Sequence, residues 1–367
     1  MSSLSVNIIL WLLLIPSSVL VCKQKRSYKK GSVHYLPIWI GIVLASLLVG
    51  LRWDNGGDYA NYFSIISDSL KDNYELERLE FIPRYLMVLI HYFHLPFYLW
   101  FILMAFFQLV FMFLLGHRIN YRLLPWIFIL YFYCLFPLSL IIIRQLVALT
   151  IVSYAYTFIK PKDILHYLLL IVLAYGFHRT SLLCIPLYWV APRLNFCNIG
   201  AQLVIVTVFL IVGNRPVELL WSLVPVDITT FRYAGYLGRE YEYGTNSGLG
   251  VLFNYIRYFI IILYSNKLKR KYEEYGFSVF YSILFVHICL YYAVKDDLPL
   301  SRAMMYFSVA EILVTCFLLH YLSRSKKNLD KISLVTVCVI IVLTMCYTAY
   351  TGPDWQFVWA VQIPYIQ

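Results

Sequence analysis

The chain has 367 residues, of which 61% are apolar and only 13% are charged, and its net charge is +11. A soluble domain keeps about a quarter of its residues charged, so this composition, with a mean hydropathy of +0.72, excludes a soluble globular protein and indicates an all-α, polytopic membrane protein. The basic residues cluster in short loops between apolar runs, which is the pattern of membrane orientation rather than of nucleic-acid binding.

Several apolar segments are long enough to cross a bilayer, since a helix crosses the ~30 Å hydrocarbon core with about 20 residues. The first of them has its basic residues after it rather than before it, so we expect a retained helix and not a cleaved signal peptide. The clear single spans are 4–22, 33–51, 97–115, 249–264, 277–294, 301–321 and 332–350.

Residues 123–159 form an apolar stretch that is too long for one span. Pro137 and Arg144 interrupt it. We therefore predict two spans, 123–139 and 142–159.

The remaining segments follow from the positions of the basic loops, because loops rich in Lys and Arg stay in the cytoplasm. Residues 164–191 must then form two short spans, hinged on the outer side at Gly176-Phe177-His178-Arg179. The prediction is a single domain, residues 1–367, with about twelve transmembrane helices and both termini outside. The other segments that this topology assigns are the interfacial helix 81–94, the short span 200–213, and the outer loops 52–80 and 214–248.

Twelve of the 30 Lys and Arg residues fall outside the predicted cytoplasmic loops, and ten of these twelve are arginine. Lysine is sufficient to orient helices, whereas the planar fork of arginine grips phosphate or carboxylate oxygens bidentately. This set therefore indicates an anionic ligand on the outer side. Its members are Arg52, Lys71, Arg78, Arg84, Arg144, Arg179, Arg215, Arg232, Arg239, Arg257, Lys295 and Arg302.

The eight cysteines form no CxxC or Cys/His cluster, and nearly all lie inside apolar runs. We therefore expect neither disulfides nor a zinc site. Phosphate-binding, zinc-protease and nucleophile-elbow motifs are also missing from the sequence. We expect no metal and no cofactor.

The first polar motif lies at the outer end of the second span and contains Arg52, Gly56, Gly57, Asp58 and Tyr59. The glycine pair permits a tight turn, so Arg52 and Asp58 could converge at the membrane surface. The alternative is a polar turn that closes the helix, with the arginine snorkelling to the surface.

The second motif is Arg144 with Gln145, embedded in a strongly apolar run. A cation at membrane depth costs at least ~2.5–3.5 kcal/mol on insertion scales, so such residues are usually paired or line a cavity. We favour a ligand-binding role over a structural ion pair, for which Glu311 is the candidate acid.

Three further segments, which contribute five residues, complete the set of candidate site residues. His178 and Arg179 lie at the predicted hinge, and interrupted helices mark substrate sites in many transporters; the alternative is a histidine that is merely hydrogen-bonded. Arg302 lies at the outer start of a predicted span, where it either binds a ligand or extends its charged group to the membrane surface. Arg232 and Arg239 alternate with aromatic and acidic residues in the loop 214–248. That arrangement suits sugar binding, or a loop that rests on the headgroups.

These motifs, in this order, resemble the EpsG/Wzy-type family of polysaccharide polymerases along the whole chain. The sequence departs from the family pattern at Gly57, where a threonine is usual, and at Thr180-Ser181, where Ser-Ala is usual. The matching segments are Arg52 with Gly57-Asp58-Tyr59-Ala60-Asn61-Tyr62, Glu80-Phe81-Ile82-Pro83 (loosely), Ile143-Arg144-Gln145, His178-Arg179-Thr180-Ser181, Ser301-Arg302 and Ile363-Pro364-Tyr365.

The resemblance implies transfer of a growing glycan from undecaprenyl diphosphate to a new lipid-linked repeat unit, at the outer face of a bacterial cytoplasmic membrane. Arginines would neutralise the diphosphate leaving group, and a base would take the proton of the acceptor hydroxyl. We expect His178 to be that base and Asp58 to align Arg52 or the acceptor. The expected ligand-binding residues are Arg52, Tyr59, Arg144, Gln145, Arg179, Arg232, Arg239 and Arg302.

The partners that the resemblance implies are lipid-linked repeat units and membrane lipid, with a chain-length regulator and a flippase as further candidates, and no nucleic acid. Three other functions remain open. A flippase or exporter of the same lipids would also use intramembrane arginines, although no inverted repeat is visible. A lipid-phosphate-dependent glycosyltransferase of another type would use an acidic pair in its first outer loop, which Asp54 and Asp58 match in type. A membrane O-acyltransferase is also conceivable, but it would usually carry a histidine deep in an apolar span.

Overall fold

The structure is a computed structural model of the whole chain. It describes residues 1–27, 35–67, 74–194, 196, 198–215, 219, 249–294 and 297–358. The chain packs as two compact units, one formed by Met1–Leu182 with Ile341–Gln367 and the other by Leu183–Ile340.

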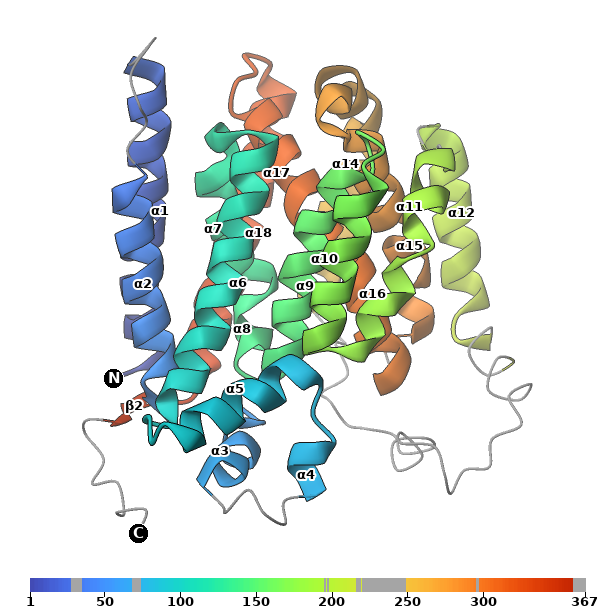
Figure 1. The fold of residues 1–367 in the computed structure, drawn as a ribbon. Coiled ribbons are helices and arrows are strands. Elements are labelled where there is room, and N and C mark those ends of the chain that lie inside the picture. Colours follow the sequence, from blue (N-terminus) through green and yellow to red (C-terminus); the bar gives the residue numbers. More distant parts are fainter. Residues whose placement is uncertain are drawn as a thin grey trace. The chain divides into compact units, whose positions relative to one another are not determined.

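Both units are built almost entirely from helices (Figure 1). Within the described part of the chain, four helices are long and apolar enough to cross a membrane: Ser3–Lys23, Tyr98–Ile119, Pro299–Leu322 and Asn328–Thr351. Shorter apolar helices cover Leu36–Gly50, Tyr121–Cys134, Ile164–Phe177, Ile199–Val212 and Phe277–Tyr291. The protein is thus an all-α membrane protein, and the number of twelve spans stays a prediction.

The first unit contains the helices from the N-terminus to the predicted hinge. The elements are α1 (Ser3–Ser27), α2 (Leu36–Gly50), β1 (Arg52–Trp53), α3 (Tyr59–Ser67), α4 (Tyr74–Glu77), α5 (Phe81–Tyr92), α6 (Tyr98–Ile119), η2 (Tyr121–Leu123), α7 (Leu124–Cys134), α8 (Phe136–Ser139), α9 (Ile143–Ala155), η3 (Tyr156–Phe158), α10 (Ile164–Phe177), the C-terminal turns of α18 (Asn328–Thr351) and β2 (Gln356–Phe357).

Two predicted interruptions of the apolar stretches occur in the structure. The long stretch 123–159 is broken between α8 and α9, and Pro137 lies in the first turn of α8, the part of a helix where proline costs least. The stretch 164–191 is broken at His178, whose extended backbone ends α10 before the 3-10 helix η4 (Arg179–Cys184).

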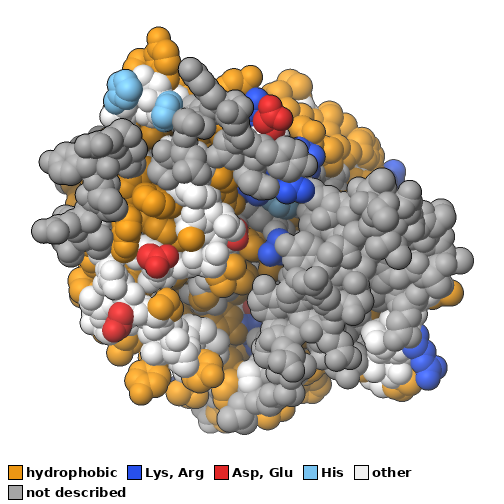
Figure 2. Space-filling view, turned by 90° about the horizontal axis from the view of Figure 1, so that it is seen from below, with side chains coloured by type: hydrophobic (Ala, Val, Ile, Leu, Met, Phe, Trp, Pro, Cys, Tyr) orange, Lys and Arg blue, Asp and Glu red, His pale blue; other side chains and the backbone are white. Residues whose placement is uncertain are grey.

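The short helices α3, α4 and α5 lie at one end of the first unit, beyond the ends of its longer helices (Figure 1). Helix α5 buries Pro83, Met87 and Ile90 and exposes large apolar side chains such as Tyr85 and Leu89. A helix with apolar side chains exposed on its outer surface suits the interfacial position predicted for residues 81–94. Figure 2 views the molecule from this end and shows hydrophobic side chains interspersed with acidic, basic and histidine side chains.

The two ends of the described chain meet at the same end of the first unit. Strand β1 pairs antiparallel with β2, with Arg52 opposite Phe357. The N-terminal ammonium donates to the carbonyl of Trp355 at 2.8 Å, and the Trp355 amide donates back to the Met1 carbonyl at 2.7 Å. The N-terminus therefore lies at the same end of the first unit as α3–α5, and the outer location predicted for both stays a prediction.

Two glycines allow close approaches around this end. Gly56 has a positive φ of 109°, and a Cβ there would lie 1.9 Å from the carbonyl oxygen of Leu140, in the break between α8 and α9. A Cβ on Gly176 would lie 2.5 Å from Ile82 and 2.7 Å from Phe81. These positions let the 54–58 turn and the first turn of α5 pack directly against the two helix breaks.

The second unit contains η4 in part, α11 (Leu187–Val190), η5 (Ala191–Arg193), α12 (Ile199–Val212), α14 (Leu249–Tyr272), η7 (Glu273–Tyr275), α15 (Phe277–Val294), α16 (Leu298–Ser308), α17 (Ala310–Leu322) and most of α18. Helix α17 is buried along almost its whole length and packs with α14 and α15. A helix that is apolar on all sides suits such a central position.

Candidate functional site

The centre of the candidate site is an ion pair between Arg144, in the first turn of α9, and Glu80, at the start of α5. One guanidinium nitrogen of Arg144 contacts a Glu80 carboxylate oxygen, and Nε donates to the hydroxyl of Tyr62 at 2.8 Å. The side chains are 17% and 6% exposed, respectively. An arginine with this little exposure needs such partners, because desolvation of an unpaired charge is costly.

Glu80 joins this pair to the broken end of α10. It occupies the N-cap position of α5, but its side chain makes no capping bond to α5. Its second carboxylate oxygen instead accepts the backbone N–H of Arg179 at 3.5 Å. Three segments that are far apart in the sequence thus meet at one carboxylate.

His178 lies directly before this contact, at the helix break that the sequence predicts. Its Nδ1 is 2.7 Å from the hydroxyl of Thr180, which holds the ring relative to η4. The His178 side chain is half-buried and that of Arg179 is exposed. Arg179 therefore contacts Glu80 through its backbone, and His178 precedes it in the chain.

Asp58, at the start of α3, belongs to the same group electrostatically. Its carboxylate acts on both Tyr62 and Arg144. The expected role of Asp58, to align Arg52 or an acceptor hydroxyl, stays a prediction.

Arg52 is 2% exposed and closes the end of α2. Its Nη1 donates to the Val49 carbonyl at 2.8 Å and its Nε to the Asn55 carbonyl at 2.9 Å. The guanidinium carbon lies 5.0 Å from the ring centre of Phe101 and 5.8 Å from that of Tyr59. Two of its three guanidinium nitrogens thus bond to the backbone around the end of α2, and the buried Nη2 has no partner among the described residues. A role of Arg52 in ligand binding stays a prediction.

Helix α3 supplies one tyrosine to each of these arginines. Tyr59 lies near Arg52 and stacks on Phe101 with ring centres 4.6 Å apart, whereas the ring of Tyr62 lies 5.7 Å from the Arg144 guanidinium carbon. Burial raises the pKa of Tyr62 to about 12, even though the charge of Arg144 acts to lower it. Tyr62 therefore keeps its phenolic proton at neutral pH.

The other predicted ligand-binding residues are distributed as follows. Gln145 is buried beside Arg144 in α9. Arg302 lies in the second unit, in the first half of α16, whose N-cap Asp297 accepts the Leu300 amide at 2.8 Å. Arg232 and Arg239 lie outside the described residues.

The acid that we considered as a structural partner of Arg144 has another partner. Glu311 pairs with Arg257 of α14 at 2.7 Å, with both side chains almost fully buried, and accepts the hydroxyl of Tyr258 at 3.0 Å. Among the described residues, each unit therefore contains one buried acid–arginine pair, and Glu311, the acid named for the structural alternative, belongs to the pair with Arg257.

Glu80 and Tyr62 are the site residues that the sequence reasoning did not assign. Glu80 directly precedes an amphipathic helix, and Tyr62 ends the Gly57–Tyr62 motif. Both sequence contexts can be recognised, but the spacing of these residues along the chain does not show that their side chains meet at Arg144. Among the described residues, no group of three His, Cys, Asp or Glu side chains is arranged to hold a metal ion.

The apolar helices, the broken helix ends and the arginine–carboxylate site together define a polytopic membrane protein with a polar site at one end of its first unit. A search against protein-family models matches the EpsG family over residues 35–365. The chain belongs to the EpsG family, and it is accordingly a polysaccharide-polymerase-type membrane protein. No curated protein and no solved structure matched the chain.

Proposed function

We propose that the protein polymerises lipid-linked repeat units, transferring the growing glycan from undecaprenyl diphosphate to the next unit at the outer face of a bacterial cytoplasmic membrane. The observation that carries this proposal is the Arg144–Glu80–Tyr62 group, which lies next to His178 at a helix break. Membership of the EpsG family supports the polymerase class.

In the proposed reaction, the acceptor hydroxyl oxygen forms a bond to the anomeric carbon of the growing chain. The bond from that carbon to the diphosphate oxygen breaks, undecaprenyl diphosphate leaves, and a base takes the hydroxyl proton. The lipid diphosphate is itself the activated donor, so the proposed transfer draws on no nucleotide.

Arg144 is the group that we assign to the leaving diphosphate. It lies in the first turn of α9, where free backbone N–H groups and the helix dipole also favour an anion. Arg179, whose backbone N–H bonds to Glu80 and whose side chain is exposed, is the second guanidinium that we assign to the diphosphate. A planar fork held by Glu80 and Tyr62 is oriented before the ligand arrives, which lowers the cost of stabilising the developing charge.

His178 is the residue that we assign as the base. Thr180 engages Nδ1 at 2.7 Å and so orients the ring, and Nε2 is the nitrogen assigned to the proton. Asp58, whose charge acts on Arg144, would help to orient that guanidinium.

The test uses purified full-length protein with a synthetic undecaprenyl-diphosphate repeat unit, without ATP or added metal, and measures dimers and longer products. We expect His178→Ala to abolish elongation while the lipid still binds. The matched control is His91→Ala, because His91 is an exposed histidine of α5. If the wild-type protein moves the lipid across vesicles and never lengthens it, the polymerase proposal fails and the flippase function replaces it.

A further inference from the structure

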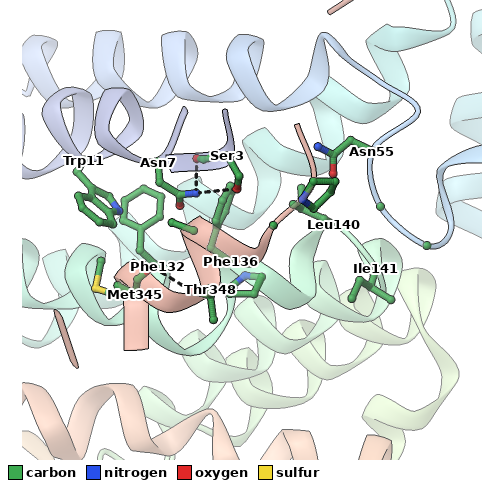
Figure 3. Close-up of a pocket in the computed structure, with 16 residues that line it drawn as sticks. Ser3, Asn7, Trp11, Asn55, Phe132, Phe136, Leu140, Ile141, Met345 and Thr348 are labelled. Atoms are coloured by element: carbon green, nitrogen blue, oxygen red, sulfur yellow. Dashed lines mark hydrogen bonds between the residues drawn. The ribbon is translucent and has the colours of Figure 1, made fainter. Parts of the chain in front are cut away.

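A cavity of about 300 Å³ lies within the first unit, apart from the residues of the Arg144 group. It is enclosed by the first turns of α1, the 55–57 turn, α7 and α8, and the last turns of α18. Figure 3 shows Trp11 and Met345 at one end of the cavity, Asn55 and Leu140 toward the other, and Ser3 with Asn7 between them.

The cavity holds buried polar atoms that have no partner among the described residues. Asn55 is 2% exposed, and neither its amide nitrogen nor its amide oxygen makes a hydrogen bond there. The backbone carbonyl of Asn55 accepts a hydrogen bond from Arg52 at 2.9 Å, which fixes this residue at the wall of the cavity. The buried indole Nε1 of Trp11 is likewise without a partner. Leaving such groups unsatisfied is costly, so they point to a ligand that both donates and accepts hydrogen bonds.

Most of the residues that line the cavity are apolar, and Ser3, Asn7, Asn55 and Thr348 add uncharged polar groups. Phe132 and Phe136 offer aromatic faces, and none of the described residues that line the cavity is a Lys, Arg, Asp or Glu. A diphosphate would find no countercharge here. A polyprenyl chain would leave the Asn55 amide unsatisfied. An uncharged pyranose ring fits both features, because its C–H faces pack on aromatic rings and its hydroxyls donate and accept hydrogen bonds.

The position of the cavity agrees with a sugar rather than with a lipid tail. It is lined by the first helical turns after the N-terminus and by the last turns of α18, where the Met1 ammonium donates to Trp355. This is the end of the first unit on which α3, α4 and α5 lie (Figure 1). Glycan and lipid headgroups occupy that side of the membrane in the proposed function, whereas tails lie deeper.

We propose that this cavity binds one uncharged sugar residue of the glycan substrate, with Asn55 as its principal hydrogen-bonding residue. The identity of the ligand as a substrate residue rests on the proposed function. The assignment of the cavity to an uncharged sugar rests on its own lining.

The experiment uses the full-length protein in lipid nanodiscs and three photoreactive probes: a diazirine-labelled methyl glycoside of N-acetylglucosamine, one of galactose, and a diazirine-labelled prenol. Mass spectrometry locates the label. We expect at least one sugar probe to label peptides that contain Trp11 or Phe132, and the prenol to label other peptides. Asn55→Leu, which keeps the volume and removes both hydrogen-bonding atoms, should reduce this labelling by about tenfold.

Two matched controls keep the result specific. Asn61→Leu changes an exposed asparagine outside the cavity and should leave the sugar labelling unchanged. If Asn55→Leu does not fold, Thr348→Val replaces it, because Thr348 lines the cavity, and Thr336→Val on an exposed turn of α18 is its control. Labelling of the cavity by the prenol alone, or by no probe, overturns the proposal, and so does equal sugar labelling in the cavity variant and its control.

Failure of this proposal is distinguishable from failure of the proposed function. Sugar labelling of the cavity in a protein that makes no polymer removes the polymerase assignment and keeps the cavity assignment. Polymer formation by a protein whose cavity is not labelled by a sugar probe keeps the polymerase assignment and removes the cavity assignment.

Discussion

Removal of the Glu80 carboxylate is the most direct perturbation of the Arg144 site. Glu80 is 6% exposed, contacts the Arg144 guanidinium, and accepts the Arg179 amide at 3.5 Å. Glu80→Ala leaves Arg144 with Tyr62 and the more distant charge of Asp58. Removing one member of a buried ion pair costs about 3–5 kcal/mol because the remaining charge is uncompensated. We expect the lower end, about 3 kcal/mol, since Asp58 also attracts Arg144.

The variant Glu80→Gln separates charge from hydrogen bonding. Its amide oxygen can still accept from one donor, so we expect a smaller loss of about 1–2 kcal/mol. For a unit of this size, 1 kcal/mol lowers the melting temperature by roughly 2–4 °C. Glu80→Ala should therefore lower it by about 6–12 °C, whereas the exposed control Glu77→Ala should stay within about 2 °C.

The assay is thermal unfolding of the purified protein in detergent, followed by tryptophan fluorescence. Arg144→Ala and the double variant with Glu80→Ala complete a double-mutant cycle, and we expect a coupling energy of about 2 kcal/mol. A melting temperature of Glu80→Ala equal to that of Glu77→Ala, or a coupling energy near zero, would refute the buried ion pair.

Four further outcomes follow from the same structure. Arg144→Lys keeps the charge, but lysine lacks the planar fork that contacts both Glu80 and the hydroxyl of Tyr62. We therefore expect polymer formation to be lost while the amount of protein stays the same. Normal polymer length would indicate a structural arginine. Gly56→Ala places a Cβ 1.9 Å from a carbonyl oxygen at a φ of 109°, so the yield of folded protein should fall sharply. The pKa of Tyr62 is raised to about 12 from an ordinary value near 10, so the folded state holds this proton more tightly than the unfolded state. The free energy of unfolding of the wild type should therefore fall between pH 10 and 12, and that of Tyr62→Phe should fall less. Reporter fusions at Ser69 and Asn246 should be active only with an exported reporter, and a cytoplasmic signal at Asn246 would contradict the hinged pair of short spans.

The sequence alone determined the features that depend on composition and local pattern. Apolar runs of about 20 residues identify membrane helices because the bilayer core contains no water to bond free backbone groups. The interruptions at Pro137 and at His178 were predictable because each is marked by residues that end or perturb an apolar helix. The arginine at position 144 stood out for the same reason, since a charge inside an apolar run is rare.

The partners of the polar residues depended on the tertiary structure. Arg144 meets Glu80, 64 positions earlier, rather than Glu311, because α5 packs against the ends of α9 and α10, and Glu311 pairs with Arg257. Arg52 and Arg144 look alike in the sequence, yet one closes α2 under an aromatic ring and the other shares a carboxylate with the Arg179 amide. Periodicity and spacing report which residues are apolar along one segment. They carry no information on which side chains from distant segments converge, because that is decided by the packing of whole helices against one another.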